Sequence, residues 1–80
     1  MKVTVKTFAV LKEHFGPIIE LNVEVGTTAN DLKNILIERK SDTAGLLQIS
    51  RCAVSDIFVS DTTVILENDT VFIIPPSSGG

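Results

Sequence analysis

Hydrophobic and polar residues alternate along two stretches near the N-terminus, and a period of two is typical of half-buried strands. In KVTVKTF, Val3 and Val5 share one face, while Phe8 continues the opposite, polar side. In IIELNVEV, the inner face is formed by Ile19, Leu21, Val23 and Val25. Between these stretches AVLKEHF fits a short helical turn closed by Gly16 and Pro17, so we predict two neighbouring antiparallel strands.

The clearest helix is predicted for ANDLKNILIERK, residues 29–40. Thr28 is a suitable N-cap, and Asp31 stands at the third helical position, as in a capping box. The positions that recur at helical spacing are Ala29, Leu32, Ile35 and Leu36. The polar residues 41–45 break this pattern, and GLLQIS after them fits either a turn or a single turn of helix.

The C-terminal half is predicted to contain several short strands. RCAVSDIFVSD fits two strands around a tight turn at Ser55 and Asp56, and a loop with a turn at residues 68–69 follows. VFIIP is a final apolar strand, in which Val71 and Ile73 face the helix while Phe72 and Ile74 turn outward. The order of elements predicts an α+β, ubiquitin-like β-grasp fold, with a mixed sheet packed on one main helix. We expect this domain to span residues 1–75 and a flexible tail to span residues 76–80.

Composition excludes several classes of function. The net charge is −3, and no dense stripe of lysine and arginine is present, so nucleic acid is not an expected partner. A single cysteine, Cys52, supports neither a disulfide framework nor an iron–sulfur cluster, and it fits a buried strand position. His14 stands without a set of residues at metal-ligand spacing, so we expect no metal site. No apolar run approaches the length of a membrane span, and we expect a cytoplasmic protein.

The sequence ends in PPSSGG, and each residue type there restricts what the segment does. Pro75 and Pro76 lack amide donors, so they stop the last strand and favour an extended chain. Ser77, Ser78, Gly79 and Gly80 are small, and glycine, which lacks a Cβ, fits a channel too narrow for other residues. The Gly80 carboxylate becomes a useful electrophile once it is adenylated with ATP. The tail therefore fits a carboxylate that is handed to another enzyme.

The whole chain resembles the MoaD/ThiS family of ubiquitin-like sulfur carriers, and it is closest to the molybdopterin synthase small-subunit branch. The resemblance rests on five segments: TFAVLKEHFG, VGTTANDLKNIL, AVSD, LENDTVF and, above all, IIPPSSGG. Three residues depart from the family pattern: Ser55 replaces the usual Asn, and Asn68 and Thr70 replace the usual Gly and Glu. None of these departures lies in the tail.

The resemblance implies a mechanism and a set of partners. A MoeB-like adenylyltransferase would use ATP to adenylate Gly80, and a sulfurtransferase system would leave a thiocarboxylate there. The tail, Pro75–Gly80, would then enter a MoaE-like large subunit and donate sulfur to the pterin precursor of the molybdenum cofactor. The chain would bind no cofactor itself and would not be catalytic alone. A heterotetramer with the large subunit is expected.

The predicted partner surface consists of Phe8, Phe58 and Ile74, which align with family positions that contact the large subunit. An apolar patch beside the tail is what a protein interface needs. Four cations are further candidates for steering partners, and the sequence does not rank them: Lys12, Lys33, Arg39 and Arg51.

Two alternative functions use the same C-terminal glycine. One is a ThiS-like carrier for thiamin biosynthesis, although such chains tend to be shorter and to lack Pro-Pro before the glycines. The other is a ubiquitin-like protein modifier that is joined to lysines. The tail alone does not distinguish this second class from a sulfur carrier.

Overall fold

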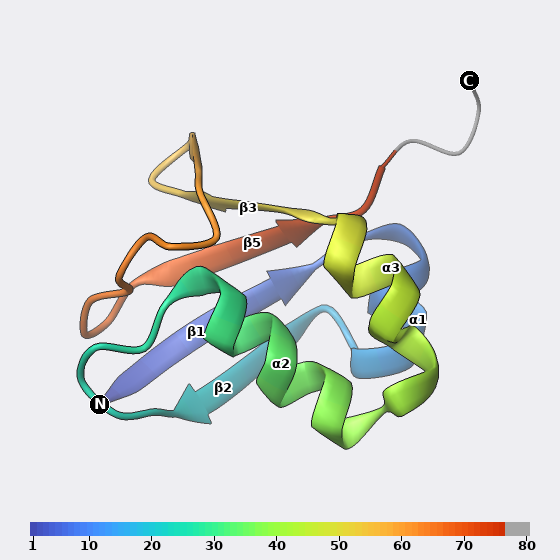
Figure 1. Ribbon diagram of the computed structural model, residues 1–80, viewed down its shortest axis with the longest axis horizontal. Coiled ribbons are helices and arrows are strands. Elements are labelled where there is room, and N and C mark those ends of the chain that lie inside the picture. Colours follow the sequence, from blue (N-terminus) through green and yellow to red (C-terminus); the bar gives the residue numbers. More distant parts are fainter. Residues whose placement is uncertain (77–80) are drawn as a thin grey trace.

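The sheet is built around the first and last strands of the chain, as the computed structural model shows for residues 1–76 (Figure 1). The strand order is β2-β1-β5-β3-β4. β1 and β5 run parallel, with Val5 opposite Val71, and the other neighbours are antiparallel. The elements are β1 Lys2–Thr7, α1 Ala9–Phe15, β2 Ile18–Asn22, α2 Ala29–Arg39, the 3-10 turn η1 Ser41–Thr43, α3 Ala44–Ile49, β3 Arg51–Val54, β4 Ile57–Val59 and β5 Thr70–Ile74.

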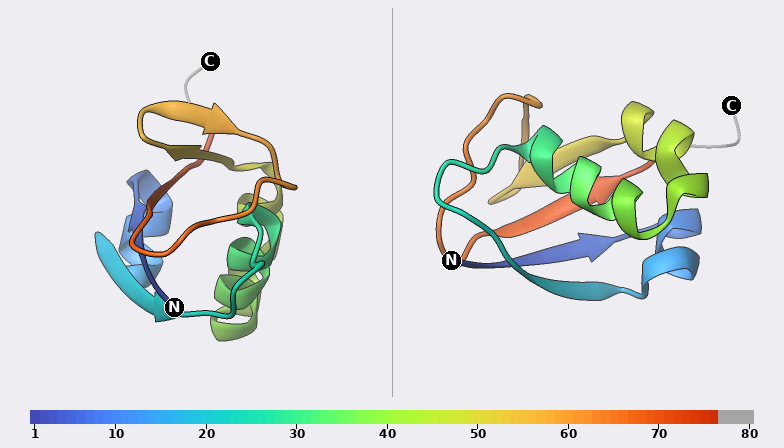
Figure 2. Two further views of the ribbon diagram at one scale, coloured as in Figure 1. Left: turned by 90° about the vertical axis from the view of Figure 1, so that its left-hand side faces the viewer. Right: turned by 60° about the horizontal axis from the view of Figure 1, so that its bottom comes forward.

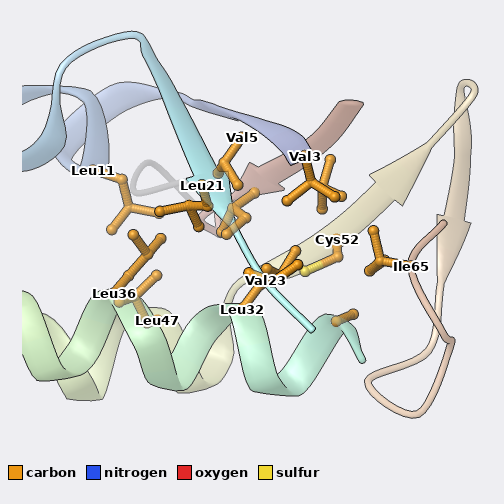
Figure 3. Close-up of a cluster of buried hydrophobic side chains, with 13 residues drawn as sticks. Val3, Val5, Leu11, Leu21, Val23, Leu32, Leu36, Leu47, Cys52 and Ile65 are labelled. Carbon is orange, nitrogen blue, oxygen red and sulfur yellow. The ribbon is translucent and has the colours of Figure 1, made fainter. Parts of the chain in front are cut away.

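Helix α2 lies across one face of the sheet (Figures 1 and 2). Buried hydrophobic side chains from the helix and from the sheet form one core cluster. Val3 and Val5 of β1 point toward Leu32 and Leu36 of α2 (Figure 3). All four side chains are buried, because both the strand and the helix turn one apolar face to the same side. The predicted β-grasp arrangement of a mixed sheet on one main helix is therefore confirmed. We call the sheet face that is turned away from α2 the outer face.

Two predicted turns are confirmed by the backbone. Ser55 and Asp56 connect β3 to β4, and both have positive φ angles, 52° and 64°. Positive φ at both central residues matches the right-handed twist of a hairpin, and Asp tolerates it better than most residues. Asn68 also has a positive φ, 68°, and the Asp69 side chain accepts a hydrogen bond from the Leu66 amide (2.9 Å). GLLQIS, which the sequence left open, belongs to α3.

The inner face predicted for IIELNVEV is wrong at its last residue. Leu21 and Val23 are buried, but Val25 is 89% exposed. β2 ends at Asn22, and Gly26 follows with a φ of 97°, so the chain turns before Val25 reaches the core. The apolar and polar residues still alternate after β2 has ended. Val25 lies in a loop, however, where no partner strand fixes the direction of its side chain.

The predicted capping box opens α2. The Thr28 hydroxyl accepts a hydrogen bond from the Asp31 amide (3.1 Å), and the Asp31 carboxylate accepts one from the Thr28 amide (2.9 Å).

Loss of such a cap costs about 1 kcal/mol. We expect Thr28→Ala to lower the free energy of unfolding by about 1 kcal/mol in urea titration, while Thr28→Ser, which keeps the hydroxyl, stays within about 0.3 kcal/mol of the parent. Equal stability of the three chains would contradict the assignment.

Candidate functional site

Strand β5 delivers the C-terminal segment to one edge of the domain. Its last residue, Ile74, pairs with Arg51 of β3, and the ladder stops there because Pro75 and Pro76 follow. Ile74 and Pro75 are half-buried, and Pro76 is exposed. Ser77, Ser78, Gly79 and Gly80 lie outside the described residues, so the roles expected for them stay predictions. The site described below is the surface around Pro75.

An apolar groove of about 250 Å³ borders this exit point. It is lined by Phe8, Ala9, Val10, Leu46, Ile74, Pro75 and Pro76. These residues come from three parts of the fold: the β1–α1 junction, helix α3, and β5 with the prolines that follow it. Phe8 is 39% exposed and Val10 50% exposed, so a large part of this apolar surface faces solvent. We call it the exit groove.

Backbone geometry holds Phe8 at the exit groove. Ala9 begins α1 with a φ of 54°, in the left-handed region that residues with a Cβ rarely adopt. This conformation costs roughly 1–2 kcal/mol for a residue other than glycine. Phe8, extended just before it, accepts the first helical hydrogen bond from Leu11 (3.1 Å) through its carbonyl. Leu11 is buried, so the packing of α1 maintains this turn and thereby the position of Phe8.

Aromatic residues continue from the exit groove across the outer face. The rings of Phe8 and Phe72 lie 5.6 Å apart between centroids. Phe72 pairs with Ala53 of β3, and Ala53 pairs with Phe58 of β4, so the three residues form one row across the sheet. Phe58 is 50% exposed. The structure thus brings two predicted interface residues, Phe8 and Ile74, together at the groove and connects Phe58 to them through Phe72.

Two cations lie over this aromatic row, and the sequence did not predict the arrangement. The Lys6 Nζ is 5.6 Å from the centroid of the Phe72 ring, and the Arg51 guanidinium carbon is 3.7 Å from that of Phe58. Lys6 is the cross-strand partner of Phe72 on the parallel β1–β5 ladder. The signal was present in the alternation of β1, which already turned Lys6 away from the core.

Lys33, a candidate for steering partners, is buried instead. It is 3% exposed, and its Nζ donates hydrogen bonds to the Ser50 carbonyl (2.6 Å) and to Asp61 Oδ1 (2.9 Å). The ammonium therefore connects α2 to the start of β3 and to the loop after β4. A charge held in this way is not available to a partner, so the candidate role of Lys33 is wrong. Lys12, Arg39 and Arg51 are exposed.

Cys52 is buried in the core beside this ion pair, as expected for a structural cysteine. Burial raises the pKa of its thiol, because the low-dielectric core disfavours the thiolate. Lys33 opposes this shift and Asp61 adds to it. The thiol stays protonated near neutral pH, which disfavours a persulfide on Cys52.

No helix within residues 1–76 is long and apolar enough to cross a bilayer. His14 is half-buried on α1, near the neighbouring ring of Phe15.

Comparisons with known proteins give the following relatives. A sequence model of the ThiS family matches residues 5–80, whereas no curated protein sequence matches the chain. Among solved structures, a putative molybdopterin converting factor subunit 1 from Pyrococcus furiosus has a TM-score of 0.84 at 23% identity, over 96% of this chain and 99% of that chain. SAMP1 from Haloferax volcanii has a TM-score of 0.83 at 18% identity, over the whole of both chains (100% each).

A third similar structure is a complex of subunits 1 and 2 of molybdopterin-converting factor from Helicobacter pylori. Its TM-score is 0.69 at 21% identity, and the match covers 100% of both chains. At these identities the three structures establish the fold that the chain shares with them, a ubiquitin-like β-grasp.

Proposed function

The chain belongs to the ThiS family of ubiquitin-like sulfur carriers, and from that membership we propose that it is the sulfur-donor small subunit of a molybdopterin synthase. The observation that supports this assignment is the exit groove, an exposed apolar surface at the base of the C-terminal tail. A tail that enters another protein needs a docking surface at its base, because docking fixes the register with which the terminus reaches the partner's active site.

The proposed chemistry takes place at the Gly80 carboxylate. One of its oxygens attacks the α-phosphorus of ATP in a MoeB-like adenylyltransferase, and pyrophosphate leaves. Sulfur delivered by a sulfurtransferase, at the oxidation level of sulfide, then attacks the carbonyl carbon and displaces AMP. The product is a thiocarboxylate on Gly80. Glycine favours the attack by sulfur because no side chain shields the carbonyl carbon.

The proposed acceptor complex contains a MoaE-like large subunit. The Helicobacter pylori structure is a complex of a similar chain with subunit 2, which supports a partner of this kind. The large subunit would supply the catalytic groups and the pterin pocket, and the tail would supply sulfur. We expect two small and two large subunits in the complex.

The test is the intact mass of the chain after incubation with ATP, the adenylyltransferase and a sulfur donor. The proposal expects a gain equal to one sulfur in place of one oxygen. The product, mixed with the large subunit and the pterin precursor, then yields molybdopterin. Transfer of sulfur to thiazole synthesis alone would assign the chain to the thiamin branch, and lysine-linked adducts without sulfur would make it a protein modifier.

The exit groove leads to a prediction about binding to the large subunit. We expect Phe8→Ala to weaken this affinity about tenfold or more, because the few aromatic anchors that become fully buried near the centre of an interface each contribute over 1 kcal/mol, and the proposal makes Phe8 such an anchor. Leu66→Ala is the control, because Leu66 is exposed in the loop between β4 and β5 and does not line the exit groove. Calorimetric titration measures both. Equal affinity of Phe8→Ala and the parent would remove the groove from the interface.

A further inference from the structure

The outer face carries two cations that have no carboxylate partner within residues 1–76. Lys6 and Arg51 each lie over an aromatic ring, whereas the third cation of this face, Lys2, contacts Glu20 (3.4 Å). A ring face attracts a cation through its quadrupole but does not neutralise the charge. In the free chain water hydrates these two charges, and a protein that covers them must replace that hydration.

Both cations flank the strand that delivers the tail. Arg51 of β3 is the cross-strand neighbour of Ile74, the last residue of β5. Lys6 of β1 is the cross-strand neighbour of Phe72, which also belongs to β5. A protein that takes up the tail, covers the exit groove and continues from Phe8 to Phe72 would reach both positions, since the two rings lie 5.6 Å apart. The two charges would then lie under or at the rim of the covered surface.

The energetics of covering them restrict the chemistry of the partner. An apolar surface placed over Lys6 and Arg51 would desolvate two charges without compensation, which costs several kcal/mol for each fully buried ion. A surface that presents carboxylates at these positions recovers this cost through charge-assisted hydrogen bonds. The remaining charges of the chain repel an acidic partner, because ten acidic residues outnumber seven basic ones. The attraction is thus confined to this face.

We propose that Lys6 and Arg51 direct the tail to an acidic docking surface on the adenylyltransferase that activates it. The proposal deepens the sulfur-carrier function above and rests on it. The partner surface would carry an apolar centre for the exit groove and two carboxylates, one beside each cation. A single-stranded nucleic acid would also suit cations stacked on aromatic rings. Two cations in a chain of net charge −3 favour the protein surface.

The experiment compares two variants with the same change in charge. Lys6→Glu with Arg51→Glu reverses the charge of the outer face. The control set, Asn30→Glu, Asn34→Glu and Lys40→Glu, places the same added negative charge on exposed positions of α2 and at its C-cap; each set changes the net charge from −3 to −7. We expect the first pair to raise the Kd for the adenylyltransferase about tenfold or more, because reversed charges meet like charges. The control set should stay within about twofold of the parent. For the parent chain the Kd should rise with ionic strength, and this dependence should weaken in the first pair.

A third variant separates charge from packing. Lys6→Met with Arg51→Met keeps long side chains over the rings and removes both charges, and its thermal unfolding checks that the sheet is intact. We expect it to show an intermediate loss of affinity. Equal weakening by the α2 control, or unchanged affinity of the first pair, would overturn the proposal. Binding of a single-stranded oligonucleotide that the first pair loses, with adenylyltransferase affinity unchanged, would do so as well.

Failure of the proposed function gives a different result. If the parent chain takes up no sulfur with any adenylyltransferase, the carrier function fails and the docking proposal falls with it. If the parent takes up sulfur and the charge-reversed chain has the same KM, only the docking proposal fails.

Discussion

A chain that ends at Gly79 is expected to take up sulfur at least a hundredfold more slowly than the full chain. Its terminus is still a glycine carboxylate, so the chemistry of the group is unchanged and only its reach is shorter. One residue of extended chain spans about 3.3–3.6 Å. A misplacement of 1 Å at a reacting centre already costs on the order of a hundredfold in rate. Intact mass measured over time gives the rate of sulfur uptake for both chains.

Two further chains define the cause of that loss. Gly80→Ala keeps the carboxylate in register but adds a Cβ, so it should lose rate without losing the product. A chain with one alanine added after Gly80 should also take up sulfur slowly, because its carboxylate lies beyond the reacting position. Affinity for the adenylyltransferase should be similar in all four chains, since the exit groove is unchanged. Full-rate uptake by the chain that ends at Gly79 would show that register does not control the reaction.

Lys33→Ala is expected to lower the free energy of unfolding by about 2–4 kcal/mol. The substitution removes two hydrogen bonds and leaves the Ser50 carbonyl without the Lys33 donor. A buried acceptor without a partner costs about 1–3 kcal/mol, and the lost packing of the lysine stem adds to this. Urea titration of the two chains measures the difference. For a domain of 80 residues this is a large share of the total stability.

Lys33→Met separates the two contributions to that loss. Methionine fills much of the space of the lysine stem but donates no hydrogen bond, so its cost reports the unpaired carbonyl and the lost ion pair. Asp61→Asn should cost less than Lys33→Ala, because the Asp61 side chain is 55% exposed and water replaces much of what is lost. A Lys33→Ala chain within about 0.5 kcal/mol of the parent would contradict the role of this residue.

The fold was predictable wherever two signals agreed. Strand β1 shows an alternation of apolar and polar residues that matches its burial, and β5 is an apolar run that ends at two prolines. Helix α2 shows both a capping box and an apolar face. Lys33 was predicted to be a surface cation because of its residue type, although its position in the helical spacing indicates burial. It follows Ala29 by four positions and precedes Leu36 by three, which places it on the buried face that contains both. A lysine at this position stays buried when hydrogen-bond acceptors lie within reach of its ammonium group, as the Ser50 carbonyl and Asp61 do here.

The candidate site was predictable only in part, because it is assembled from distant segments. Phe8 and Ile74 were identified as exposed apolar residues, and both line the exit groove. Leu46, which completes it, comes from α3, and the sequence of that segment fits a turn as well as a helix. The cations over Phe72 and Phe58 depend on strand register between β1, β5, β3 and β4. Long-range register is set by the whole sheet and leaves little trace in a local pattern.

The parallel pairing of β1 with β5 has a consequence for synthesis on the ribosome. Thr4 to Thr7 become interior strand residues only when Thr70 to Ile73 have emerged, so the nascent chain holds its first strand without its parallel neighbour until β5 has been synthesised. Closing a loop of that length is slow relative to forming local hairpins. A chain that stalls before residue 70 would expose the apolar face of β1 and be open to proteolysis. Folding would therefore act as a check that synthesis has reached the strand from which the reactive end extends.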